Sequence, residues 1–183
     1  MDTQRFIHIP KTGGISVIQY LRDNKINFVH GVEKQPNVFV RKHSTAAQWI
    51  NEPFKRFAIV RNPHTRLVSY YRYVLERQSL ACSFTEFVVK QIEPDISRSR
   101  IPSPWISQLF WIFDSNNLIV DSVFRFETLE RDLQQYFGLH TAMPKLNITN
   151  HDNQDLMDWY TPETLEIVQK YFAKDFEFIK QLP

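Results

Sequence analysis

The sequence contains little cysteine and little glycine. Its 183 residues include 1 cysteine, Cys82, and only 4 glycines. A single cysteine excludes a disulfide within the chain and fits a reducing compartment. No stretch approaches the roughly 20 apolar residues of a membrane-spanning helix. Lys11, Gly13 and Gly14 interrupt the apolar run near the N-terminus, so it does not resemble a signal peptide. We therefore expect a cytoplasmic protein without a membrane span.

The sequence also lacks a strong overall charge, because its formal net charge is only +2. The charges are nevertheless unevenly distributed. Residues 1–77 hold 13 Lys and Arg against 5 Asp and Glu, whereas residues 78–183 hold 9 against 15. The positive part would attract a polyanionic ligand. The basic residues form no continuous run and no known nucleic-acid motif, so we expect no nucleic-acid partner. No spacing of His, Asp or Glu predicts a metal site.

The composition predicts a well-packed core, since 43% of the residues are hydrophobic and 15 are phenylalanine. A chain of this length fits one domain, residues 1–183. Apolar runs alternate with amphipathic segments, which predicts an α/β fold with a mainly parallel sheet flanked by helices. The expected strands are 5–10, 38–41, 57–60 and 118–124, and the expected helices are 14–23, 43–50, 63–78, 83–91, 105–113, 127–137 and one beginning at Thr161 and Pro162.

Residues 6–16 read Phe-Ile-His-Ile-Pro-Lys-Thr-Gly-Gly-Ile-Ser and carry most of the functional signal. A strand, a glycine turn and the start of a helix together form an anion site, because free backbone N–H groups and the helix dipole favour negative charge there. The lysine precedes both glycines, unlike in a Walker A loop, and the glycine spacing does not fit a dinucleotide fold. The predicted ligands are Lys11, Thr12, Gly13, Gly14 and Ser16.

A second strand runs into a helix at residues 57–73. Asn62 is suited to cap that helix and Pro63 to begin it. Arg61 then lies at the end of the strand, where a guanidinium can form a bidentate contact with a phosphate. Ser69 lies about two helical turns further on. Ligands of parallel sheets bind beyond the carboxyl ends of the strands, so we expect Lys11 and Arg61 to converge.

The order Pro-Lys-Thr-Gly-Gly-x-Ser at residues 10–16 resembles the 5′-phosphosulfate loop of sulfotransferases that use 3′-phosphoadenosine 5′-phosphosulfate (PAPS). The likeness is to the branch with carbohydrate 2-O-sulfotransferases and small bacterial members. Arg61 with Ser69, eight positions later, resembles the pair that holds the 3′-phosphate. Segments 123–129 and 171–179 resemble structural parts of the family. The resemblance implies a P-loop-like α/β domain with PAPS as co-substrate.

The resemblance implies transfer of a sulfuryl group to a hydroxyl of a carbohydrate or another small acceptor. Lys11 would stabilise the leaving phosphate. We predict His43 as the general base, because it follows the expected strand 38–41 and because Lys-His-Ser-Thr-Ala resembles a recurring segment of bacterial members. His64, Glu52 and Glu127 remain alternative bases. His8, inside the first strand, is expected to be a core residue.

Two further segments have weaker roles in this interpretation. Asn147 and His151, in the connection 140–160, are expected to cover the nucleotide. Gln108 and Trp105 are candidates to face the acceptor, although Trp105 also fits a buried structural role.

Two other functions remain open. One is a P-loop kinase-like phosphotransferase acting on ATP, against which the position of Lys11 argues. The other is a non-catalytic nucleotide-binding module on the same fold. The sequence carries no feature that identifies the acceptor or the oligomeric state.

Overall fold

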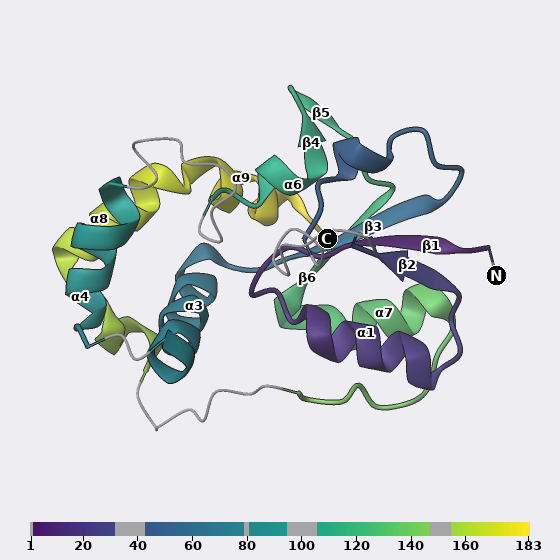
Figure 1. Cartoon of the computed structure of the whole chain (residues 1–183), viewed down its shortest axis with the longest axis horizontal. Coiled ribbons are helices and arrows are strands. Elements are labelled where there is room, and N and C mark those ends of the chain that lie inside the picture. Colours follow the sequence, from purple (N-terminus) through teal and green to yellow (C-terminus); the bar gives the residue numbers. More distant parts are fainter. Residues whose placement is uncertain (1, 32–42, 79–80, 95–105, 147–154) are drawn as a thin grey trace. The chain divides into compact units, whose positions relative to one another are not determined.

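The computed structural model describes residues 2–31, 43–78, 81–94, 106–146 and 155–183 (Figure 1). The chain divides into two compact units. Unit 1 comprises residues 1–61, 108–147 and 182–183, and unit 2 comprises residues 62–107 and 148–181. Each unit therefore combines segments that lie far apart in the sequence.

Unit 1 is built on a four-stranded sheet in the order β2-β1-β3-β6, and every pairing in it is parallel. This confirms the predicted α/β class and the parallel sheet. Phe6 of β1 pairs with Phe57 of β3, which in turn pairs with Ser122 of β6. The strands are β1 (Gln4–Ile7), β2 (Phe28–His30), β3 (Lys55–Val60) and β6 (Ser122–Arg125).

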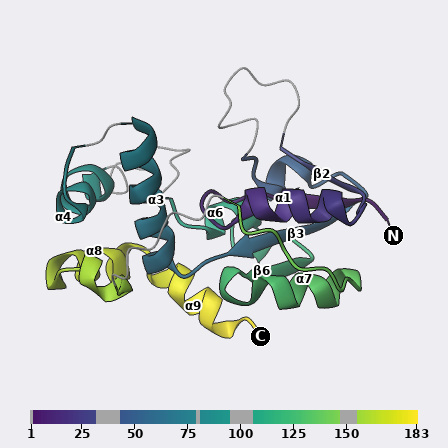
Figure 2. The ribbon, with the colours of Figure 1, turned by 90° about the horizontal axis from the view of Figure 1, so that it is seen from below.

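Helices α1 (Gly14–Asp23) and α7 (Leu129–Phe137) cover one face of this sheet (Figures 1 and 2). Alternate strand residues point to this face. The core beneath the two helices consists of Phe6, Phe57, Ile59, Val17, Tyr20, Leu21, Leu129, Leu133 and Phe137. The helical turn η3 (Phe126–Thr128) joins β6 to α7.

Shorter elements lie on the other face of the sheet (Figure 1). They include the helix α6, in which Trp111 and Ile112 are buried, and a small antiparallel hairpin. These elements are η1 (Ala46–Trp49), α6 (Leu109–Ile112), β4 (Phe113–Asp114) and β5 (Asn117–Leu118).

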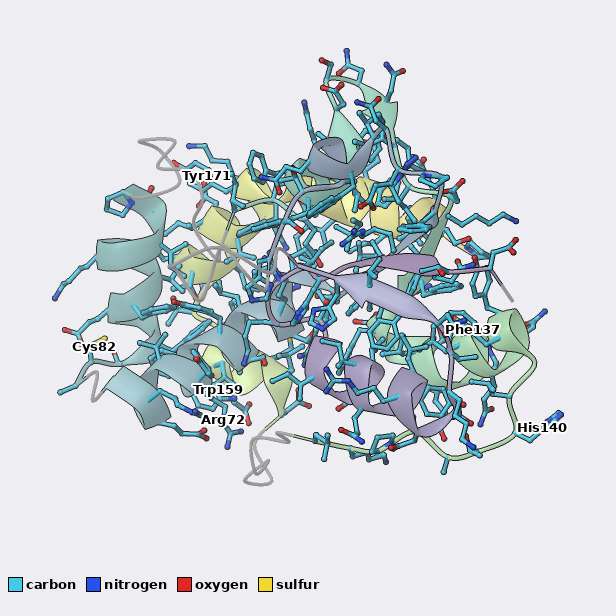
Figure 3. The ribbon with its side chains drawn as sticks, turned by 45° about the vertical axis from the view of Figure 1, so that its right-hand side comes forward. Arg72, Cys82, Phe137, His140, Trp159 and Tyr171 are labelled. Atoms are coloured by element: carbon cyan, nitrogen blue, oxygen red, sulfur yellow. The ribbon has the colours of Figure 1, made fainter. Side chains whose placement is uncertain are left out.

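The regular elements in the described part of unit 2 are all helices or helical turns. Aromatic side chains dominate its core, where Tyr71 contacts Phe84, Phe87 and Trp159. The guanidinium of Arg72 lies 6.0 Å from the centroid of the Trp159 ring (Figure 3). The elements are α3 (Pro63–Gln78), α4 (Phe84–Phe87), the π-helical turn η2 (Val88–Ile92), η4 (Leu156–Trp159), α8 (Pro162–Tyr171) and α9 (Ala173–Gln181).

The predicted helices 14–23 and 63–78 are confirmed with the same bounds. Capping boxes at Ser83 and Thr161 begin α4 and α8 where the sequence predicted helix starts. The first predicted strand ends early, at Ile7. The predicted strand 38–41 lies outside the described residues.

The predicted strand 118–124 is confirmed only from Ser122 onward. Residues 117–118 instead close the β4–β5 hairpin, and β6 begins only at Ser122. Asp121 fixes this break, because its carboxylate accepts a hydrogen bond from the backbone N–H of Arg56 at 2.7 Å and its own N–H donates to the Arg56 carbonyl at 2.8 Å. The predicted helix 105–113 is reduced in the described residues to α6, which ends at Ile112 because the hairpin begins at Phe113.

Within the described segments, no helix has the length and apolar character needed to cross a membrane. In the same segments, no group of three His, Cys, Asp or Glu side chains is arranged to hold a metal ion.

Gly138 provides a test of how α7 ends. Its φ of +66° is left-handed, and a Cβ added there would meet no described atom within 4 Å. We therefore expect Gly138→Ala to lower the free energy of unfolding by about 1 kcal/mol through backbone strain alone. Gly138→Asn should cost less, because asparagine tolerates this conformation. Urea denaturation measures both changes, and equal losses for the two variants would contradict the explanation.

Candidate functional site

The loop that follows β1 turns sharply before α1. Lys11 has a φ of +67° and Gly13 a φ of +81°. A left-handed conformation costs a lysine roughly 1–2 kcal/mol, and such outliers concentrate at functional sites. Thr12 is fully buried, and its hydroxyl donates to the Ile9 carbonyl at 3.0 Å. The Thr12 side chain therefore holds the turn, which leaves its backbone N–H as its means of binding an anion.

The two glycines make room for side chains of this chain. A Cβ on Gly13 would lie 2.8 Å from the Phe126 ring, and one on Gly14 would lie 2.0 Å from Nε2 of His8. Both glycines are predicted ligands of an anion. In the structure, Gly13 adopts the left-handed conformation that glycine favours, and Gly14 leaves space for the His8 ring.

The N-terminus of α1 is suited to an anion. In the described residues its first turn contains no acidic side chain, and no side chain caps it. The N–H groups of a first helical turn have no partners within the helix and lie at the positive end of the helix dipole. Gly14 and the residues after it therefore present hydrogen-bond donors beside Lys11.

Ser16, on the first turn of α1, bonds to the chain that follows α7. Its hydroxyl accepts from the Leu146 backbone N–H at 3.0 Å and donates to the Leu146 carbonyl at 3.3 Å. A hydroxyl has one proton to donate. An anion that binds Ser16 must therefore compete with the Leu146 carbonyl for that proton.

Arg61 lies at the end of β3, next to the loop that follows β1. Its Nη1 donates to the Lys11 carbonyl at 3.4 Å, which confirms the predicted convergence of these two residues. The guanidinium also lies 4.1 Å from the centroid of the Phe126 ring. Burial lowers the pKa of Arg61 to about 10, and the Glu127 carboxylate opposes this shift. Arg61 therefore remains a cation at neutral pH.

Gln108 holds the backbone of Arg61 from two sides. Its Oε1 accepts from the Arg61 N–H and its Nε2 donates to the Arg61 carbonyl, both at 2.8 Å. The side chain is 0% exposed, so the prediction that it faces the acceptor is wrong. Sequence reasoning missed this supporting role, because its partner lies 47 positions away.

Ser69 lies on α3 in unit 2, where it is half-buried. Its pairing with Arg61 at a phosphate stays a prediction.

His43 contacts His8, which directly follows β1. Its Nδ1 lies 2.7 Å from the His8 carbonyl, and the two ring centroids are 4.3 Å apart. Because a carbonyl only accepts, Nδ1 is the protonated nitrogen. Nε2 of the neutral ring then carries the lone pair that a general base needs.

The alternative bases have other surroundings. Arg5 donates to both carboxylate oxygens of Glu52, at 2.8 and 2.6 Å. Glu127 lies near enough to Arg61 to influence its pKa. His64 belongs to unit 2, where it packs against Tyr160 and Phe176, and burial lowers its pKa. The contacts of His43 with His8 place it beside the residues that lead from β1 into the loop with Lys11.

Three other predicted residues, Trp105, Asn147 and His151, lie outside the described residues. Their roles stay predictions.

The chain matches a model of a protein family. A family model described as "Sulfotransferase family" matches residues 5–180. This match covers the loop after β1, Arg61 and His43. Neither the curated proteins nor the solved structures include a match to the chain.

The double contact of Gln108 with Arg61 leads to a stability prediction. Gln108→Leu would remove both hydrogen bonds between this buried side chain and the Arg61 backbone, so we expect the free energy of unfolding to fall by about 1–3 kcal/mol. The matched control is Gln134→Leu, which removes one exposed hydrogen bond to the Thr141 carbonyl and should change stability by no more than about 0.5 kcal/mol. Chemical denaturation compares the two, and equal effects would show that Gln108 does not support Arg61.

Proposed function

The chain belongs to the sulfotransferase family, and we propose that it moves a sulfuryl group from PAPS to a hydroxyl of a carbohydrate or another small acceptor. Family membership supports sulfotransferase activity in general. The donor, the acceptor and the carbohydrate 2-O-sulfotransferase-like branch are parts of the proposal. The observation that carries it is the contact of Arg61 with the carbonyl of Lys11, beside the uncapped N-terminus of α1.

This arrangement offers two kinds of anion ligand. Backbone N–H groups at the start of α1, with Lys11 and Ser16, would hold the 5′-phosphosulfate. Arg61, joined by Ser69, would hold the 3′-phosphate through charge-assisted hydrogen bonds. The adenosine of PAPS carries anionic groups at both its 3′ and 5′ ends, so it matches a site with two separate sources of positive charge.

The proposed reaction needs three contributions from the chain. Nε2 of His43 takes the proton of the acceptor hydroxyl. The acceptor oxygen forms a bond to sulfur while the bond from sulfur to the 5′-phosphate oxygen breaks. The Lys11 ammonium stabilises the negative charge that this oxygen gains. The backbone around Gly13 would hold the donor in line with the acceptor.

Nucleotide binding separates this function from a kinase-like alternative. We expect 3′-phosphoadenosine 5′-phosphate to raise the melting temperature, and ATP with magnesium to have a smaller effect. Adenosine 5′-phosphate lacks the 3′-phosphate, so it should bind the wild type more weakly than 3′-phosphoadenosine 5′-phosphate does. Arg61→Ala should bind the two nucleotides with equal affinity. Stronger stabilisation by ATP with magnesium would favour the phosphotransferase.

Acceptor screening with labelled PAPS then tests turnover. Transfer to a hydroxyl of a carbohydrate or another small molecule supports the enzyme. Binding of the nucleotide without transfer to any acceptor would favour the non-catalytic module.

Lys11 is expected to matter for turnover rather than for folding. Lys11→Ala should lower the rate at saturating PAPS by about 10²–10³-fold, the scale for loss of one electrostatic group from a transition state. Lys25→Ala is a closely matched control, because Lys25 is also a lysine with a left-handed backbone, at φ +56°, and is exposed after α1. Steady-state kinetics measure both variants. Near-normal turnover of Lys11→Ala would refute the leaving-group role.

His43→Ala should lower turnover by about 10²–10⁴-fold and leave nucleotide affinity nearly unchanged, because a base acts on the acceptor. Wild-type activity should also fall towards acid pH, since only the neutral imidazole accepts a proton. The exposed His140 provides the control variant His140→Ala. Kinetics and calorimetry measure the two effects. If His43→Ala is fully active while Glu52→Gln or His64→Ala is not, the base is another residue.

A further inference from the structure

His8 occupies the junction between the loop and His43. It directly follows β1, and its side chain is almost fully buried, at 6% exposed. Its ring stacks on that of Phe6, with centroids 5.5 Å apart and an interplanar angle of 17°. The same residue contacts His43 twice, through its carbonyl and through its ring.

We propose that His8 is a positioning residue that links the orientation of His43 to the first turn of α1. This inference rests on the proposed base role of His43. The His8 carbonyl fixes which nitrogen of His43 is protonated, and the His8 ring fixes the direction in which the other nitrogen points.

The carbonyl contact alone leaves one rotation of the His43 ring unrestrained. A single hydrogen bond at Nδ1 selects the tautomer, but the His43 ring can still rotate about the line joining Nδ1 to the carbonyl oxygen. The His8 ring, 4.3 Å away at an interplanar angle of 55°, limits this rotation. A base must be held within about 10–20° of its productive orientation, so this second contact affects proton transfer.

The contact of His8 with α1 explains how a shift of the first turn of α1 can reach His43. A Cβ on Gly14 would lie 2.0 Å from Nε2 and 2.1 Å from Cδ2 of His8, so the ring fills the space of a side chain at that position. Any shift in the first turn of α1 therefore moves the His8 ring or is resisted by it. The anion-binding turn and His43 thus rest against the same imidazole.

A double-mutant cycle between His8 and Gly14 tests this link. His8→Ala should lower kcat on the order of 10²-fold, the scale for a misplaced catalytic group, with little change in KM for PAPS. Gly14→Ala should have a similar effect, because its methyl displaces the His8 ring. Adding Gly14→Ala to His8→Ala should cost nothing further, since the methyl then enters vacated space. The proposal would be overturned if the losses of kcat in the two single variants add in the double variant and if Gly14→Ala weakens binding of 3′-phosphoadenosine 5′-phosphate both with and without His8. Such a result would show that Gly14 acts through contact with the ligand.

The ring signals of His43 provide a readout independent of turnover. Imidazole ¹⁵N NMR should show Nδ1–H in both the wild type and His8→Ala, because the backbone carbonyl remains in the variant, but the His43 ring signals should broaden in His8→Ala because the ring is no longer held against rotation. Unchanged His43 ring signals and unchanged kcat in His8→Ala would overturn the proposal. If no acceptor is sulfated, the proposed function fails, but the spectra still decide whether His8 positions His43. His8→Asn keeps a polar group near the position of Nδ1 and removes the outer ring atoms, so it replaces His8→Ala if that variant does not fold.

Discussion

Parallel pairing of β1 with β3 is the constraint on which the candidate site depends. Ile7 pairs with Ala58, so both strands end at the same edge of the sheet. The residues after each end then have to lie side by side, which brings Arg61 to the carbonyl of Lys11. Neither residue could be placed there by its own local sequence, because the two are 50 positions apart.

The groups that would contact a ligand are held mainly by neutral, buried contacts. Gln108 fixes the backbone of Arg61, and Phe126 lies against both Arg61 and the position of a Gly13 side chain. These neutral supports add no charge of their own, whereas the Glu127 carboxylate acts on the charge of Arg61. The backbone of Arg61 is therefore held by neutral groups, and its charge is modulated by a carboxylate.

Local signals in the sequence were sufficient for the helix starts, whereas the approach of Lys11 to Arg61 was predicted from the expected parallel sheet. Asn62 and Pro63 predict the start of α3, and the Asn62 side chain accepts from the backbone N–H of His64 as a capping residue does. The break at Asp121 was not predictable, because it depends on hydrogen bonds to Arg56, 65 positions earlier. The need for glycine at position 14 likewise follows only from the packed position of the His8 ring. Local propensity identified the elements, and contacts between distant residues determined these details.

The division of the chain between two discontinuous units has a consequence for folding. Unit 1 needs β6 and α7, and its hydrogen bonds join Gln4 to Tyr136 and Ser16 to Leu146, 132 and 130 positions apart. Contacts of such separation close large loops, which makes folding slow. During synthesis, Phe6 and Phe57 emerge long before Leu133 and Phe137, which pack with them in the finished core. The nascent sheet therefore exposes an apolar face until more than two thirds of the chain has been made, a period in which aggregation competes with folding.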